Sequence, residues 1–227
     1  MLTEEEAARV RESVERVAQR ANETIAQADT AWRAVLFIDV LHENLDRVAQ
    51  QVDATQPAIA CKAGCAWCCS RRVEVNEAEA LRLAHHLRGL EAGVQRELTA
   101  RLQHIARLRA VAGTRHVPEP CALLKDNLCS VYAIRPAVCR KGHSLSEQAC
   151  ATRAQTIPQN LTRLLHSEAL IAGTHAGYQR NQLRASSHEL SAAVLAALGN
   201  EHALDDWFSG QPLLGTVAPD SPASSAA

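Results

Sequence analysis

The sequence contains eight cysteines, and all of them lie between residues 61 and 150. Four stand within nine residues, in the segment Cys61-Lys-Ala-Gly-Cys65-Ala-Trp-Cys68-Cys69. The other four follow at wider spacing: Cys121, Cys129, Cys139 and Cys150. Thiolate is a soft, negatively charged ligand, and zinc and iron are metals that such ligands select in proteins. The clustering therefore predicts that all eight cysteines are metal ligands.

The spacing leaves open how many metal ions are bound. Neighbouring side chains diverge, so the adjacent pair Cys68 and Cys69 serves two ions more easily than one tetrahedral ion. Eight thiols match two sites of four cysteines, and they also match one four-thiolate iron–sulfur cluster with ligands to spare. His143 follows Cys139 by four residues and could replace a cysteine ligand. Magnesium and calcium are not expected, because no acidic segment accompanies the thiols.

Basic residues flank both groups of cysteines. They are Lys62, Arg71 and Arg72 beside the first group, and Lys125, Arg135, Arg140 and Lys141 within the second. Nearby cations lower the pKa of a thiol and offset the negative charge that four thiolates leave on a divalent metal. The charge pattern therefore agrees with a metal site, although arginine is common throughout the chain.

The second group carries a recognisable pattern of other residues. Cys129 is followed by Tyr132, by Arg135-Pro136 and by Cys139-Arg140. Together with the first group, this resembles the YkgJ-type cysteine-cluster family, the CxxCxxCC type, which is described as a zinc- or iron-chelating domain. The resemblance covers about residues 57–150. It departs from the family where three residues, rather than two, separate Cys61 from Cys65, and Cys150 lies outside its two strongest blocks.

Composition indicates a mainly α-helical globular protein. The 227 residues are 47% hydrophobic and 22% charged, with only 3% aromatic residues. The formal charge of −1 gives no indication of nucleic-acid binding. No apolar run approaches the ~18 residues of a membrane span, and the acidic start Met-Leu-Thr-Glu-Glu-Glu does not resemble a signal peptide. We therefore expect a cytoplasmic protein with reduced thiols rather than disulfides; its partners are unknown.

Hydrophobic periodicity and capping residues predict helices on both sides of the cysteines. Helices are expected over residues 3–27, 31–51, 77–88, 91–111, 160–180 and 186–198, with a strand at 72–75 and a short helix carrying Cys150. Capping residues are Thr3 with Glu6, Asn76 with Glu79, Ser144 with Glu147, and Ser186 with Glu189.

These elements suggest four regions around a central, irregular, cysteine-rich segment. They are an N-terminal helical hairpin (1–55), the cysteine-cluster metal-binding domain (56–155), C-terminal helices packing on it (156–210) and a disordered tail (211–227). The hydrophobic residues within 121–143 do not recur at a regular spacing. We therefore expect metal, rather than a hydrophobic core of the segment's own, to hold these residues in place.

The function that these observations favour is a metal-binding protein whose thiolates hold zinc or iron, with an iron–sulfur cluster as one form of the latter. One alternative is an iron–sulfur-dependent methyltransferase, implied by a similarity to the cysteine cluster of flagellin lysine methylases. No glycine-rich nucleotide loop, acid–histidine pair or other catalytic motif supports an enzyme. Another alternative is a metal chaperone or redox sensor that uses the vicinal Cys68 and Cys69.

Overall fold

The computed structural model describes residues 3–53, 58–113, 115, 117 and 119–214. Its helices over these residues are α1 (Glu4–Ala26), α2 (Ala31–Asp53), α3 (Glu77–Arg88), α4 (Ala92–Ala112), α5 (Ala137–Lys141), α6 (Glu147–Ala151), α7 (Leu161–Arg180), α8 (Leu190–Gly199) and α9 (Ala203–Phe208). The fold is thus mainly α, as the sequence predicts. From residue 215 onward, the expected disordered tail lies outside the described residues. Among the helices described, none combines the length and apolar character that crossing a membrane requires.

The strands and 3-10 turns are short. The strands β1 (Glu74–Val75) and β4 (His188–Glu189) pair antiparallel, as do β2 (Leu124–Lys125) and β3 (Leu128–Cys129). Two 3-10 turns, η1 (Trp67–Ser70) and η2 (Tyr132–Ile134), lie among the cysteines. The β2–β3 turn places Asp126 and Asn127 at positive φ, which is the backbone that a two-residue hairpin loop requires.

Two of the predicted helix starts are wrong. Thr3 with Glu6, and Asn76 with Glu79, do form capping boxes. However, α6 is capped by Ser146 rather than Ser144. Helix α8 begins only at Leu190, where the carboxylate of Glu189 accepts from the backbone N–H of Ala192. The residues before it form β4, because pairing with β1 outweighs local helix propensity.

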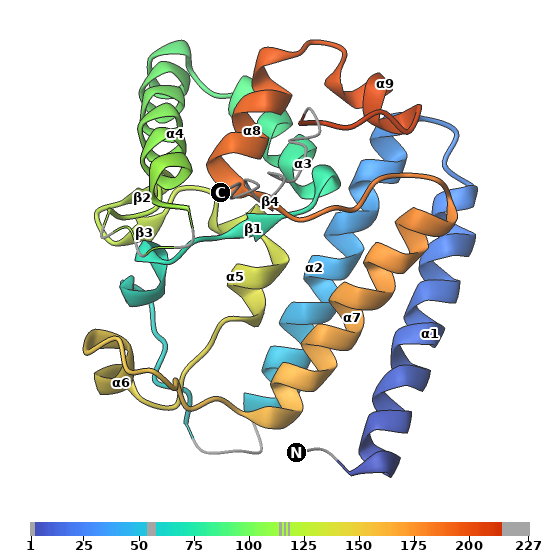
Figure 1. Cartoon of the computed structure of the whole chain (residues 1–227), viewed down its shortest axis with the longest axis vertical. Coiled ribbons are helices and arrows are strands. Elements are labelled where there is room, and N and C mark those ends of the chain that lie inside the picture. The colour runs from blue at the N-terminus through green and yellow to red at the C-terminus, as the bar shows by residue number, and fades with distance from the viewer. Residues whose placement is uncertain (1–2, 54–57, 114, 116, 118, 215–227) are drawn as a thin grey trace, which may run out of the picture.

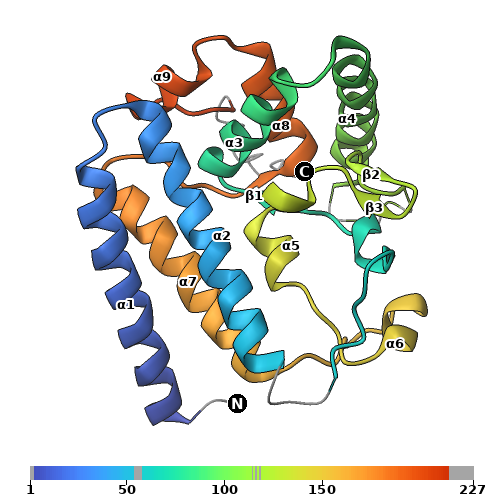
Figure 2. The ribbon, with the colours of Figure 1, turned by 180° about the vertical axis from the view of Figure 1, so that it is seen from behind.

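Three long helices form one side of the molecule. Helix α7 packs against both α1 and α2, as the two opposite views show (Figures 1 and 2). Helix α1 lies chiefly along α7 and makes few contacts with α2, its neighbour in sequence. Gly173 and Gly177 of α7 allow this close approach. A Cβ at Gly177 would stand 2.3 Å from the Cβ of Ala21, and one at Gly173 would stand 2.5 Å from the Cβ of Val17.

Replacing Gly177 by alanine is therefore expected to destabilise the protein. The gain of about 1 kcal/mol in helix propensity is outweighed, because the new methyl group also meets the backbone of Ala21 and Asn22 at 3.1 Å and would force the helices apart. We expect a net loss of about 2 kcal/mol in the free energy of unfolding, measured by urea denaturation. Gly199→Ala is the control, since nothing lies within 4 Å of its added Cβ; equal stability of the two variants would contradict the close packing.

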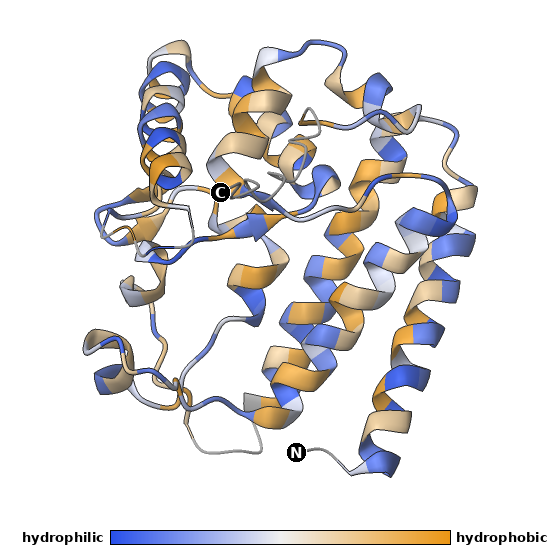
Figure 3. Ribbon diagram, in the orientation of Figure 1, coloured by the Kyte–Doolittle hydropathy of each residue, from blue (hydrophilic) through white to orange (hydrophobic). Residues whose placement is uncertain are grey.

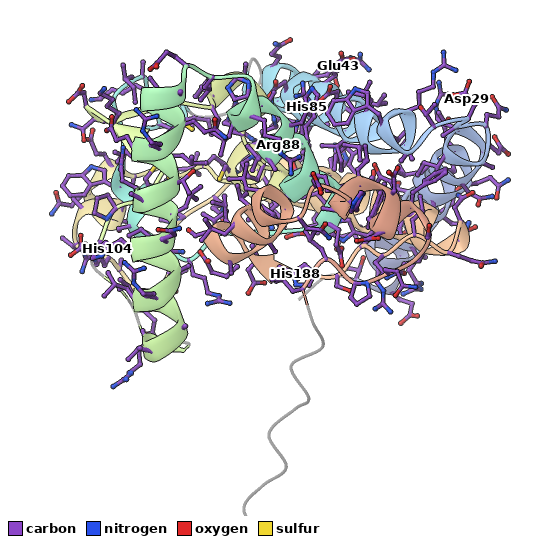
Figure 4. All side chains as sticks on the ribbon, turned by 90° about the horizontal axis from the view of Figure 1, so that it is seen from above. Asp29, Glu43, His85, Arg88, His104 and His188 are labelled. Carbon is purple, nitrogen blue, oxygen red and sulfur yellow. The ribbon has the colours of Figure 1, made fainter. Side chains whose placement is uncertain are left out.

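Two hydrophobic cores share α3 and α8. One joins these helices to the long helices and to Trp207 of α9, while the other joins them to α4 and the β2–β3 hairpin. Accordingly, α8 is hydrophobic over most of its length (Figure 3). Arg88 of α3 holds the end of α8 by donating to the carbonyl oxygens of Ala197 and Asn200 at 2.5 and 3.1 Å (Figure 4).

The segment 121–143 is better packed than the sequence suggests. Ala122 and Leu123 are each 1% exposed and Val131 is 3% exposed; all three belong to the second core. The segment therefore has no core of its own, but it contributes to one shared with α3, α4 and α8, which the expectation of metal alone did not include. Its apolar residues are too few and too irregularly spaced to reveal a period, yet each finds a partner on a helix far away in the sequence.

Candidate metal centre

The elements that carry the cysteines gather on the side of the molecule away from α1 (Figure 1). They are the segment ending in η1, the β2–β3 hairpin, α5 and α6. Two backbone hydrogen bonds join the first group of cysteines to the second. The N–H of Cys121 donates to the carbonyl oxygen of Cys69 at 2.7 Å, and that of Ala60 donates to Ser144 at 2.8 Å. Two segments distant in sequence thus form one site.

Four of the cysteines line a cavity of about 490 Å³. We call them the outer set: Cys61, Cys65, Cys68 and Cys150. Cys150, which falls outside the strongest sequence blocks, reaches the cavity because α6 lies against η1. Trp67 also lines the cavity and remains 49% exposed, so it does not fill a core beneath the loops.

The remaining four cysteines do not line this cavity. We call them the inner set: Cys69, Cys121, Cys129 and Cys139. Burial raises the pKa of the Cys139 thiol, and the nearby thiols of Cys121, Cys68 and Cys129 add to this rise. Burial likewise raises the pKa of Cys121, and its neighbour Cys129 contributes. Cys139 is nevertheless exposed as a residue, although protein atoms surround its thiol closely enough to raise its pKa.

Cys68 and Cys69 connect the two sets. Their thiols are hydrogen bonded, with Cys69 donating to the sulfur of Cys68. This bond lowers the pKa of Cys68 to about 6 and raises that of Cys69. The charge of Arg71 lowers the pKa of Cys68 further. The hydrogen bond keeps these two sulfurs close together, so the adjacent pair links the cavity-lining set to the other four cysteines.

The donor chemistry fits zinc or iron, whereas the present spacing of the sulfurs is wider than coordination requires. All eight cysteines are free thiols. Within the described parts of the chain, no group of three or more His, Cys, Asp or Glu side chains is arranged so that it could hold a metal ion as it stands. Rotation of a cysteine about χ1 moves its sulfur while leaving the backbone in place. Metal binding would therefore require the thiols of each set to turn inward.

Both ring nitrogens of His143 form hydrogen bonds, although His143 lines the same cavity as the outer set. Its Nδ1 lies 2.9 Å from the carbonyl oxygen of Lys141 and must donate there, while its Nε2 accepts from the backbone N–H of Asn160 at 2.9 Å. In this arrangement His143 holds two loop segments together.

A carboxylate from α2 supports the second group of cysteines. Asp46 pairs with Arg135 at 3.3 Å and with the buried Arg140, and Arg140 also donates to the carbonyl oxygen of Arg135 at 3.0 Å. The guanidinium of Arg135 lies 4.0 Å from the centre of the Tyr132 ring. The tyrosine and arginines of the sequence motif therefore anchor the turn before Cys139 to the long helices.

Asp46→Ala is expected to lower the free energy of unfolding by about 2 kcal/mol. Breaking a buried ion pair costs about 3–5 kcal/mol, and we expect less here because Asp46 is 41% exposed and water can partly replace it. Urea denaturation of the metal-loaded protein measures the loss. The matched control is Asp29→Ala, since the pair of Asp29 with Arg33 is exposed and is worth under about 0.5 kcal/mol. A similar loss in both variants would contradict an anchoring role for Asp46.

Most of the flanking cations have carboxylate partners. Lys62 pairs with Glu147, Arg72 with Glu74, and Lys141 with Glu168. Of the flanking cations predicted to offset thiolate charge, Arg71 lowers the pKa of Cys68, and Arg135 counteracts the rise that burial causes at Cys129.

Sequence reasoning missed the cation beside Cys121. It is Arg109 of α4, which is buried, donates to the carbonyl oxygen of Arg71 at 3.0 Å and lies 3.5 Å from the carboxylate of Glu189. No signal in the sequence around Arg109 links it to Cys121, because its burial and its place beside the thiol arise only from the packing of α4.

Comparison with known proteins agrees with this site. Residues 60–158 match the model of the CxxCxxCC family, described as "putative zinc- or iron-chelating domain". This match includes all eight cysteines and covers less than half of the chain. No curated protein and no solved structure matches the chain. The matched segment, residues 60–158, is the one that carries both the inner and the outer set of cysteines.

Proposed function

We propose that the eight cysteines hold two zinc or iron centres, one in the outer set and one in the inner set. The observation that carries this proposal is that four of the eight free thiols line one cavity, while the other four lie near one another. Cys121 and Cys129 raise the pKa of Cys139, and Cys121 and Cys139 raise that of Cys69. Four thiolates complete the coordination of a structural zinc ion. Four thiolates also hold an iron–sulfur cluster, so the division suits either metal.

The charges around the thiols support this assignment. Zn²⁺ with four thiolates carries two net negative charges, which must be offset when the site lies within the protein. The charge of Arg71 acts to lower the pKa of Cys68. Arg109 has the same effect on Cys121, and Arg135 on Cys129. Each of the three cations favours the thiolate form, the form that binds a metal.

The inner centre would stabilise the fold directly. It would join η1, the β2–β3 hairpin and α5, all of which are too short to be stable alone. A structural zinc ion supplies an apparent binding free energy of about 10–16 kcal/mol, and this becomes folding free energy. We therefore infer that the metal and the small second core together hold the segment between Cys121 and Cys139.

Metal analysis of anaerobically purified protein tests the proposal. Colourless protein with about two zinc ions per chain is expected for two Cys₄ zinc sites. Brown protein with iron and acid-labile sulfide is expected if a set holds an iron–sulfur cluster. The matched variants Cys139→Ser and Cys150→Ser should each lose one centre and keep the other. Metal-free protein, or metal content that neither variant changes, would overturn the proposal.

A further inference from the structure

The two sets of cysteines differ in that only the outer set lines a cavity. The outer set faces a cavity of about 490 Å³, which lies in the size range of small-molecule sites rather than of a bare ion. Its other walls include Trp67 and Ile157. Cys69 and the other members of the inner set do not line this cavity, and Cys121 and Cys129 pack against the second core. A molecule that enters the cavity would therefore meet the outer thiols alone.

The cavity wall is positively charged. Arg71 and Arg153 line it, and no carboxylate does so. Within the described residues, neither guanidinium forms an ion pair, in contrast to the neighbouring Arg72, which pairs with Glu74 at 3.3 Å. Glu147, on the same helix as Cys150, is already engaged by Lys62 at 3.2 Å and by the indole of Trp67. The cavity can thus attract an anion, and Arg71 and Arg153 can offset the negative charge of metal-bound thiolates.

We propose that the outer set is an exchange site, which passes its metal to an anionic small ligand bearing carboxylate or thiolate groups, while the inner set retains its metal. This inference rests on the proposed function and treats the outer metal as cargo. Arg71 and Arg153 bring the anionic acceptor into the cavity against the repulsion of the thiolates. Each acceptor atom then donates an electron pair to the metal as one cysteine sulfur leaves with its own pair. The released thiolate takes a proton from water, so no oxidant or reductant is needed.

Release kinetics test this inference on zinc-loaded protein, with EDTA as the anionic acceptor. We expect about half of the zinc to leave in a fast phase and the rest at least about tenfold more slowly. In the variant Arg71→Gln/Arg153→Gln, the fast phase should slow by about tenfold, because charged clefts raise the rates of oppositely charged ligands by factors of this order or more. Added salt should slow the wild-type fast phase and have little effect on that of the variant.

Two controls separate the cavity charge from a general loss of structure. The single variant Arg153→Gln should release its outer zinc to EDTA more slowly than wild type, whereas the uncharged chelator ortho-phenanthroline should remove it from both proteins at rates within about twofold, since no charge attracts it. Arg72→Gln should leave the EDTA rate unchanged, because Arg72 does not line the cavity. A variant that slowed both chelators equally, or left the EDTA rate unaltered, would overturn the role of the arginines.

The outcomes also distinguish this inference from the proposed function. Protein that binds two zinc ions but releases them in a single phase would overturn the exchange site and leave the two centres intact. Cys150→Ser should lack the outer zinc. A fast phase that persists in this variant would come from the inner set and would also overturn the exchange site. Protein that binds no metal would overturn the proposed function itself.

Discussion

Cys139→Ser is expected to lower the midpoint of thermal unfolding by about 10–20 °C, whereas Cys150→Ser should lower it by less than about 5 °C. Cys139 belongs to the inner set, whose metal would hold the hairpin, η2 and α5 together. The loss of roughly 5 kcal/mol of folding free energy corresponds to a shift of this size in a chain of this length. Cys150 lies on α6 and faces the cavity, so its loss should affect the outer centre alone.

Metal content and limited proteolysis should accompany the thermal measurement. We expect both variants to lose one equivalent of metal, and only Cys139→Ser to become sensitive to protease between residues 119 and 143. The long helices should still give a strong helical circular dichroism signal in both variants, because α1, α2 and α7 pack together without the cysteines. Equal destabilisation of the two variants would contradict a structural role restricted to the inner set.

Glu79→Ala should produce the largest stability loss of any substitution outside the cysteines, about 3–5 kcal/mol. The carboxylate of Glu79 is buried and accepts from the backbone N–H of Asn76 at 3.1 Å and that of Ala137 at 2.6 Å. His42 approaches it at 3.5 Å. Removing the carboxylate would leave two buried N–H groups without acceptors at the start of α3 and of α5, the helix that carries Cys139.

Urea denaturation of the metal-loaded protein measures this loss. Two further variants test whether it comes from the buried hydrogen bonds of Glu79. Glu79→Gln should fall between wild type and Glu79→Ala, because its amide keeps one oxygen that can accept from Ala137. Glu74→Ala should cost less than about 1 kcal/mol, since Glu74 is an exposed carboxylate that pairs with Arg72 and accepts from Ser187. A loss below about 1 kcal/mol in Glu79→Ala would show that water reaches the two N–H groups.

Local sequence signals predicted local structure well. The capping boxes at Thr3 and Asn76 start helices where expected, because their hydrogen bonds join residues only three apart. The helix at 186–198 was misplaced by a few residues, because β4 gains its partner from β1, more than 100 residues earlier in the chain. Similarly, the low periodicity of 121–143 concealed apolar residues whose partners lie on distant helices.

The same distinction applies to the candidate site. Residue type alone identified the cysteines as candidate metal ligands. Thiols this close together are explained by metal binding, whereas ordinary packing does not require them. The supporting charges could not be found in this way. Asp46, Glu79 and Arg109 lie on helices predicted from their hydrophobic faces, and nothing in their immediate sequence links them to a thiol.

The sequence by itself determined the helical class, the ends of several helices and the clustering of eight thiols. These depend on residue chemistry and on interactions within a few positions of the chain. Only the tertiary structure decided that α1 packs on α7, and that Cys150 joins Cys61, Cys65 and Cys68 at one cavity, which Cys69 does not line. These choices depend on which distant segments pack together, and that is set by the shape and burial of whole helices rather than by spacing along the chain.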